Sequence, residues 1–301
     1  MNWKKLGQIY FFRPIDKYLL THASNPLAIH LKKDIYRVFF CARNIENKSS
    51  VGFVDIDIIK IKEISTCRKT VIKFGNKNSF YSHGIGIGNM YNADNKNYIQ
   101  FMAWQIPENG HWRGDIGRFE LSKDYKTLNV DPNKVFIGCD NEDKISLSYS
   151  WVIREKDMYK MWYVSVIDWA SNNGEMIAVI KYATSKDGEK WQKHGLAVPY
   201  ELGVAQAFSR PTVIKDNDGY HMWFSYRSGD GTKYRIGYAH SLDGKTWDRK
   251  KNSGIDVSGD GWDSEMVCYP FVFDHRGERY MLYNGNDYGK TGFGLAILEN
   301  K

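Results

Sequence analysis

The sequence lacks the features that mark membrane-spanning and nucleic-acid-binding proteins. It has no apolar run of roughly 18 residues, the length that a membrane-spanning helix requires. It has no basic helix and no lysine- or arginine-rich tract, and its net charge of +7 is scattered along the chain. Nucleic-acid-binding proteins normally concentrate positive charge on one face. The sequence therefore predicts no membrane span and no nucleic acid partner.

Cysteine is scarce and no metal-binding motif is present. The four cysteines lie far apart and form no C-x-x-C pair, and the eight histidines have no ligand spacing. We therefore expect no metal ion and no other cofactor. The opening segment, MNWKKLGQIYFFRP, lacks the apolar core of a signal peptide. Together with cysteines that suit a reducing compartment, it predicts a cytoplasmic location.

Helical periodicity is also nearly absent, whereas aromatic residues are plentiful. The chain has 20 Tyr, 15 Phe and 10 Trp, and such rings favour β-strands. Their flat apolar faces and polar edges also suit sugar binding, although many of the rings can simply fill a β core. We expect an all-β chain with almost no helix.

A tyrosine-containing segment recurs along the whole sequence. The tyrosines of DIYRVFFCAR, KNYIQFMAWQ, DMYKMWYVSV, GYHMWFSYR and ERYMLYNGND are separated by 62, 61, 61 and 60 residues. An apolar segment precedes each tyrosine strand and a third strand follows it. In two copies the third strand leads into S-x-D-G-x-x-W, at 185–191 and 241–247, and 122–128 is a weaker form. Asp-Gly favours a tight hairpin turn, after which the tryptophan begins a fourth strand.

Four strands in each of five repeats of this length are typical of a β-propeller. We predict one domain over residues 1–301, a five-bladed β-propeller with four antiparallel strands per blade. The blades are expected at about 22–75, 80–140, 145–200, 205–258 and 262–301, and the 20 N-terminal residues are expected to close or cap the ring. An irregular β-sandwich would leave the even spacing unexplained.

In a propeller the innermost strands line a central channel, so polar residues at their ends can share one cavity. Residues before the first strands and seven positions after each tyrosine give the candidates for substrate binding. They are Asn25, Arg43, His83, Gln105, Tyr149, Trp151, Arg210, Arg227 and Tyr269.

Three arginines and several carboxylates come from these positions. Arg43, Arg210 and Arg227 suit a carboxylate or phosphate group of a ligand, or each can pair with a carboxylate of the channel. Glu265 is the first candidate for a catalytic acid or base, with Asp263 or Asp287 beside it. Asp115, Asp168 and Glu175 are further carboxylates, whereas Asp187 and Asp243 are expected to stabilise turns.

The segment NP…IYRVFFCAR, the turns YATSKDGEKW and GYAHSLDGKTW, and the five-fold period resemble the five-bladed propeller glycoside hydrolases of families 32, 43, 62, 68 and 130. The closing stretch from Asp263 resembles uncharacterised members associated with bacterial surface-polysaccharide synthesis. The resemblance implies a propeller that acts on glycosides, and phosphorolytic members of family 130 use arginines for phosphate.

The sequence departs from the family 43 pattern at its catalytic positions. The resemblance places a general-base aspartate before a proline in the first blade, where this chain has Asn25 before Pro26. An amide cannot accept a proton at neutral pH. The second blade has Ser82 and His83, and the third has Tyr149, Ser150 and Trp151, in place of the remaining carboxylates. These departures put ordinary inverting hydrolysis in question.

We therefore expect a carbohydrate-active enzyme of polysaccharide metabolism that cleaves or transfers a glycosyl group on an anionic sugar. In this hypothesis the three arginines hold the anion, while Trp151, Tyr149 and Tyr269 stack on sugar rings. The alternative is a non-catalytic propeller that binds a glycan or sugar phosphate through a degenerate active site. A propeller that binds only proteins would leave the recurring arginines unexplained.

Overall fold

The computed structural model describes residues 1–108, 110–229 and 231–299. Within these residues nearly all regular structure is β-strand, and α1 (Asn286–Gly289) is the one helical segment. The prediction of an all-β chain with almost no helix is confirmed. No helix in this part of the chain is long and apolar enough to cross a membrane.

Two sheets of four consecutive antiparallel strands come first. One consists of β2 (Thr21–Lys32), β3 (Ile35–Arg43), β4 (Ser49–Asp57) and β5 (Lys62–Thr66). The other consists of β6 (Gly84–Ala93), β7 (Lys96–Gln105), β8 (Arg113–Leu121) and β9 (Leu128–Asn129).

The next sheet has eight strands and consists of two antiparallel halves. The first half contains β10 (Ser146–Glu155), β11 (Met158–Asp168), β12 (Ile177–Ser185) and β13 (Gln192–Leu196). The second half contains β14 (Ala207–Asp216), β15 (Gly219–Arg227), β16 (Arg235–Ser241) and β17 (Asp248–Lys250). A single parallel residue pair, Ala178 with Ala207, joins the halves.

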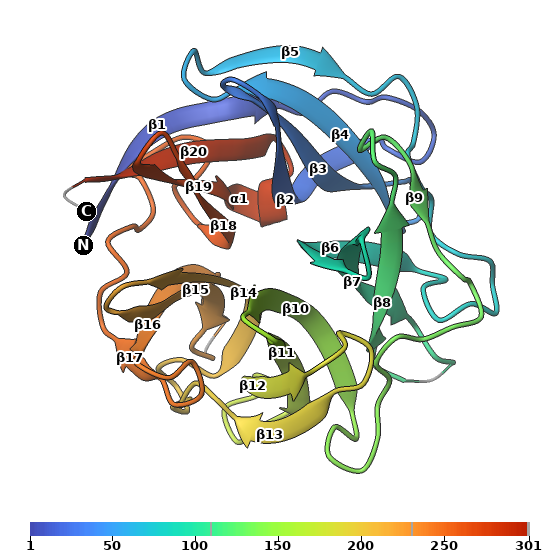
Figure 1. Cartoon of the computed structure of the whole chain (residues 1–301), viewed down its shortest axis with the longest axis vertical. Coiled ribbons are helices and arrows are strands. Elements are labelled where there is room, and N and C mark those ends of the chain that lie inside the picture. Colours follow the sequence, from blue (N-terminus) through green and yellow to red (C-terminus); the bar gives the residue numbers. More distant parts are fainter. Residues whose placement is uncertain (109, 230, 300–301) are drawn as a thin grey trace.

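The last sheet brings the two ends of the chain together. It contains β18 (Cys268–His275), β19 (Glu278–Asn284), β20 (Gly292–Glu299) and β1 (Asn2–Phe11). The N-terminal strand β1 runs antiparallel to β20, so the first and last strands lie side by side (Figure 1).

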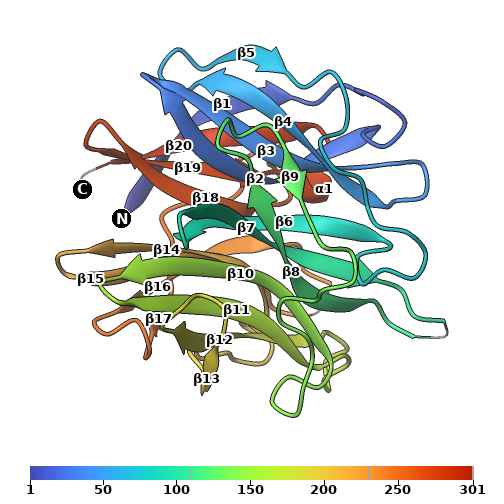
Figure 2. The same ribbon diagram turned by 45° about the vertical axis from the view of Figure 1, so that its right-hand side comes forward.

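The sheets form a ring around the centre of the molecule (Figure 1), and Figure 2 shows the same ring from an oblique side. The innermost strands are β2, β6, β10, β14 and β18, and each contacts the next around the ring. The repeated tyrosine lies on the second strand of each four-stranded unit, at positions 36, 98, 159, 220 and 280. The repeat of the sequence is therefore the repeat of the structure.

The Asp-Gly turn after β16 shows how neighbouring units are joined. The Asp243 carboxylate accepts hydrogen bonds from the backbone N–H groups of Lys245 and Thr246, and Gly244 adopts a φ of 74°. The Gly244 carbonyl accepts hydrogen bonds from Trp162 Nε1 at 2.7 Å and from Trp247 Nε1 at 3.0 Å. Because Trp162 belongs to β11, this turn connects the two halves of the eight-stranded sheet.

Replacing Trp162 by alanine is expected to lower the free energy of unfolding by about 3–5 kcal/mol, because a fully buried ring leaves a cavity. The exposed Leu242 beside the same turn is the control, since Leu242→Ala is expected to change stability by less than about 0.5 kcal/mol. Urea denaturation followed by tryptophan fluorescence measures both variants. If Trp162→Ala and Leu242→Ala had equally small effects on the free energy of unfolding, Trp162 would not stabilise the contact between the turn and β11.

Candidate functional site

Each innermost strand has an irregularity that begins in its first half, and these irregularities shape the centre of the ring. The pairing register shifts between residues 24 and 27, 87 and 90, 147 and 150, 209 and 212, and 268 and 271. Asn25, Arg210 and Tyr269 lie within these shifts and have positive φ angles of 56°, 45° and 54°. A bulge re-aims side chains that a regular strand would alternate between its two faces. Non-glycine residues in this conformation are strained and occur preferentially at functional sites.

Arg210 extends from β14 across the centre of the ring. Its guanidinium donates hydrogen bonds to backbone carbonyls on three other innermost strands: Ile87 at 3.4 Å, Pro26 at 2.7 Å, Tyr269 at 2.8 Å and Pro270 at 3.2 Å. The side chain is buried, and burial lowers the pKa of Arg210 to about 10, so it stays charged at neutral pH. All three of its guanidinium nitrogens thus donate to the protein, which favours a structural role for Arg210 over the predicted binding of a ligand anion.

A cavity of about 250 Å³ lies at the centre of the ring. Its lining is rich in aromatic rings and hydroxyl groups. The aromatic residues are Trp104, Trp112, Tyr149, Phe208, Tyr234 and Tyr269, and the polar ones are Ser24, Asn25, Arg43, Ser49, Ser148 and Ser209. Of the predicted binding residues, the structure thus brings Asn25, Arg43, Tyr149 and Tyr269 together here.

Asn25 offers a free donor inside this cavity. Its side chain is 3% exposed, and its Oδ1 lies 3.3 Å from the Tyr149 hydroxyl, which donates to it. Its backbone N–H donates to the Asn284 side chain at 2.9 Å. The Nδ2 of Asn25 has no hydrogen-bond partner among the described residues. A buried amide without a partner is costly. Nδ2 itself is buried, so a rotation of the Asn25 side chain would let it donate to a ligand in the cavity.

Among the residues that the structure describes, Arg43 is the one cationic residue of the cavity lining. Within the described part of the chain no carboxylate lies within ion-pair distance of its guanidinium, which is 5.9 Å from the centre of the Tyr288 ring. Nearby His22 is buried, and burial together with the charge of Arg43 lowers the pKa of His22 to about 4. The imidazole is therefore neutral at pH 7 and adds no second positive charge beside Arg43.

The predicted catalytic carboxylates do not line the cavity, and neither does any other Asp or Glu that the structure describes. Glu265 is exposed and forms an ion pair with Lys233. Asp263 is buried, but it accepts hydrogen bonds from Lys5 at 2.7 Å and from the Tyr283 hydroxyl at 3.0 Å. The structure therefore does not bring Glu265 and Asp263 together as an acid–base pair.

Asp287, the third predicted carboxylate, lies in α1, close to the innermost strand β2 (Figure 1). It has a φ of 51°, its side chain is 63% exposed, and its charge acts on His22. The adjoining Tyr288 carbonyl accepts a hydrogen bond from the Ser24 hydroxyl. Asp287 is thus near the His22 and Arg43 side of the cavity without lining it.

Arg227 pairs with a carboxylate, which was the alternative for the predicted arginines. Its guanidinium lies 2.9 Å from Glu175 Oε1 and 4.9 Å from the centre of the Tyr234 ring. Tyr234 and Met176, which follows Glu175, line the cavity. The Arg227–Glu175 ion pair is therefore located behind the cavity wall.

The remaining predicted residues lie around the cavity. His83 Nδ1 accepts a hydrogen bond from the Ile106 N–H at 3.2 Å, and Gln105 ends β7. Trp151 is 7% exposed and packs 5.5 Å from Phe271 in the core. These positions do not support direct contact with a ligand in the cavity.

Trp104, Trp112, Tyr234 and Ser49 line the cavity but were missed by sequence analysis. Trp104 immediately precedes Gln105, which was predicted because it lies seven residues after the repeated tyrosine. The lining residue is therefore one position away from the predicted one. Trp112 and Tyr234 follow long loops, and Ser49 begins the third strand of its unit. All three lie at the start of the third strand of their units: Trp112 and Tyr234 come 14 residues after the repeated tyrosine, and Ser49 comes 13 residues after it. This offset was a repeated signal that the sequence analysis did not use.

No protein-family model matches the chain. The uncharacterized protein Rv1502 of Mycobacterium tuberculosis strain ATCC 25618 / H37Rv is 38% identical over 307 residues, covering 100% of both chains. The chain belongs to the family of Rv1502. The uncharacterized protein MT1551 of strain CDC 1551 / Oshkosh matches with the same identity and coverage.

Solved structures with the same fold are propeller glycosidases. One, described as a glycoside hydrolase, has a TM-score of 0.79 and 15% identity, over 99% of this chain and 93% of that chain. A structure from the GH130 family of mannoside phosphorylases and glycoside hydrolases has a TM-score of 0.69 and 12% identity, over 99% and 94%. Sucrose-6-phosphate hydrolase from Lactobacillus gasseri has 0.67 and 12%, over 96% and 62%. At such identities the similarity shows the fold.

Replacement by methionine should change the stability of the protein strongly at Arg210 and only slightly at Arg43. Arg210→Met is expected to lower the free energy of unfolding by at least about 3 kcal/mol, because buried carbonyls lose their charged donor. Arg43→Met is expected to change it by less than about 1 kcal/mol, because no ion pair is broken. Urea denaturation measures both. A stable Arg210→Met variant would contradict the structural role of Arg210.

Proposed function

We propose that the chain is a single five-bladed β-propeller whose central cavity binds a sugar that carries one acidic group, either a carboxylate or a phosphate. Five four-stranded units, each with its tyrosine on the second strand, support the number of blades. The four free cysteines support a cytoplasmic location. The resemblance to proteins of surface-polysaccharide synthesis supports a role in polysaccharide metabolism.

The unpaired Arg43 in a carboxylate-free lining is the observation on which this proposal rests. A partly buried guanidinium without a counter-ion attracts an anion, and its planar donors fit both carboxylate and phosphate groups. His22 near Arg43 is neutral, so it adds no second positive charge beside the guanidinium. This arrangement favours a ligand with a single acidic group.

The rest of the lining suits the body of a sugar. Tyr149 and Tyr269 have their ring centres 5.8 Å apart, and Tyr234 lies 6.0 Å from Tyr269, so a continuous aromatic wall is available. Aromatic walls pack against the apolar faces of sugar rings. The free Asn25 Nδ2 and the serine hydroxyls can bond to sugar hydroxyls. A volume of about 250 Å³ is small for a ligand site, which favours one or two sugar units over a long chain.

The proposal predicts that charged sugars raise the melting temperature more than neutral sugars of the same size. Glucuronate, glucose 6-phosphate and inorganic phosphate are the charged probes, with glucose and maltose as neutral probes. A ligand that binds only the folded state stabilises it by mass action. Arg43→Met is expected to weaken binding of the charged probe by roughly 10- to 150-fold, the equivalent of about 1.5–3 kcal/mol for a charged hydrogen bond.

Arg276→Met is the matched control for this experiment. Arg276 is an exposed arginine that pairs with Asp34 away from the cavity, so its loss should leave the affinity unchanged. Calorimetric titration of the same probe measures all three proteins. Equal stabilisation by glucose and glucuronate, or full affinity in Arg43→Met, would contradict the proposal.

A second candidate function is cleavage or transfer of the glycosyl group, as the shared fold of the glycoside hydrolases suggests. Fold similarity alone does not establish an activity. Glycoside hydrolysis normally requires two carboxylates beside the bond that breaks, and the described lining contains none. Glu175 is the carboxylate that this candidate would require, because it precedes the lining residue Met176 and its side chain is 14% exposed.

The second candidate predicts turnover of nitrophenyl glycosides of acidic sugars and its loss in Glu175→Gln. The decrease in kcat should be about 10²- to 10⁴-fold, the usual contribution of a general acid or base, while affinity for the sugar is retained. Glu201→Gln is the control, because Glu201 is an exposed partner of Arg249. If the wild-type protein binds the sugar but shows no turnover, the catalytic function is rejected and sugar binding remains as the proposed function.

A further inference from the structure

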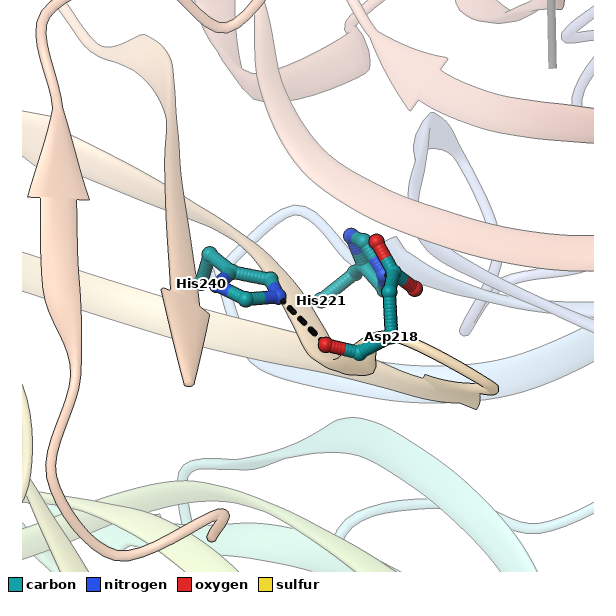
Figure 3. Close-up of side chains that lie close together, drawn as sticks. All are labelled: Asp218, His221 and His240. Carbon is teal, nitrogen blue, oxygen red and sulfur yellow. Dashed lines mark hydrogen bonds and ion pairs between the residues drawn. The ribbon is translucent and has the colours of Figure 1, made fainter. Parts of the chain in front are cut away.

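Two histidines and an aspartate lie together at one end of β15 and β16, away from the central cavity (Figure 3). One ligand atom from each of Asp218, His221 and His240 lies within 4.8 Å of the others. The ligands of a tetrahedral zinc ion are about 3.4 Å apart, given zinc–nitrogen bonds of about 2.0–2.1 Å. Small side-chain rotations would therefore bring these three atoms to metal-binding distances.

The backbone holds the three residues in a fixed relation. His221 and His240 are directly opposite each other on antiparallel strands, with ring centres 5.1 Å apart. Asp218 lies in the tight turn between β14 and β15, three residues before His221. The paired strands and the tight turn already hold the backbone of these residues in place. Binding of a metal ion would therefore cost little conformational entropy.

The nitrogens that would bind the metal already point at Asp218. His221 Nε2 is 3.0 Å from Asp218 Oδ1, and His240 Nε2 donates to the Asp218 carbonyl at 3.1 Å (Figure 3). The other ring nitrogen of His221 lies 2.7 Å from the Tyr238 hydroxyl. A hydroxyl can donate or accept, so His221 can move its proton to Nδ1 and free Nε2 without losing this partner. Such an outer partner orients most metal-binding histidines.

The local charge also favours a divalent cation. The Arg279 guanidinium lies between Asp216 and Asp274, with contacts of 2.7 Å and 2.8 Å. Asp216 Oδ2 is in turn 3.5 Å from His221 Nε2. Asp216 is therefore a second carboxylate close to His221, in addition to Asp218. Asp218 is exposed, so an ion can reach the site from solvent.

Corresponding positions in other units show that the propeller repeat does not require these residues. The cross-strand pair that matches His221 and His240 is Lys160 with Thr184 in the preceding half-sheet. It is Arg37 with Asp55 in the first sheet, where the two side chains form an ion pair. Strand formation alone therefore does not explain a histidine pair at this place.

We propose that Asp218, His221 and His240 bind one divalent transition metal ion, of which Zn²⁺ suits two imidazoles and a carboxylate. Water completes the four-coordinate shell, and the ion connects the turn before β15 to β16. This site is independent of the central cavity and of any sugar bound there. It differs from the expectation of a metal-free protein, because strand register supplies the proximity that sequence spacing does not show.

Titration of the chelator-treated protein with Zn²⁺ alone tests the proposal. We expect one ion per chain by calorimetry and a higher melting temperature, because the ion binds the folded state. Asp218→Asn and His240→Gln should each weaken Zn²⁺ binding at least about 10-fold, and Tyr238→Phe about 10-fold through the outer partner of His221. Co²⁺ should give a visible absorption band that His240→Gln removes.

His194→Gln is the matched control, because His194 lies on β13 and contacts the Thr184 hydroxyl at 2.8 Å. Its Zn²⁺ affinity should equal that of the wild type. Circular dichroism before titration verifies that each variant is folded. Asp218 lies in an exposed turn, so Asp218→Asn is expected to fold and to test the loss of one metal ligand. Failure to bind Zn²⁺ stoichiometrically, or wild-type affinity in both Asp218→Asn and His240→Gln, would overturn the proposal.

Discussion

The charge of Arg210 is the constraint on which the centre of the ring depends. A buried guanidinium must be surrounded by acceptors, and here the acceptors are carbonyls of β2, β6 and β18. Those carbonyls are directed inward because the strands bulge at this level, with Asn25 and Tyr269 strained to positive φ. One side chain therefore links four of the five innermost strands. It also fixes the backbone from which Asn25 and Tyr269 enter the cavity, so ring geometry and cavity shape are maintained by the same contacts.

The repeated backbone leaves each unit free to contribute a different side chain to the centre. At equivalent bulges the chain has Asn25, Tyr149, Arg210 and Tyr269, which supply an amide, two phenols and a guanidinium. Propeller glycosidases share this fold, yet carboxylates are absent from the described lining of this cavity. Fold and chemistry are separable in this way because few side chains determine the reaction, whereas many determine the packing.

The tyrosine period and the Asp-Gly turns could be predicted from sequence because they are local and recur. The strand content and the position of each tyrosine on a second strand follow from them. The distinction between Arg43 and Arg210 could not be predicted, since both were expected at strand ends around one cavity, Arg43 after a second strand and Arg210 at the start of a first strand. Only contacts with Pro26, Ile87 and Tyr269, each about 60 or more residues away, show that Arg210 is satisfied by the protein. The different partners of Asp263 and Glu265, which are Lys5 and Lys233, could likewise not be predicted, because no local pattern connects these residues.

The pairing of β1 with β20 has a consequence for how the protein is made. Asn2 is opposite Glu299, so the last sheet contains both ends of the chain. During synthesis β1 is made long before β20, so it has no partner strand until β20 has also left the ribosome. The other units consist of strands that follow one another along the chain and can pair as they emerge, whereas the last sheet is completed only when β20 is available. Until then β1 is an unpaired edge, which is open to incorrect pairing.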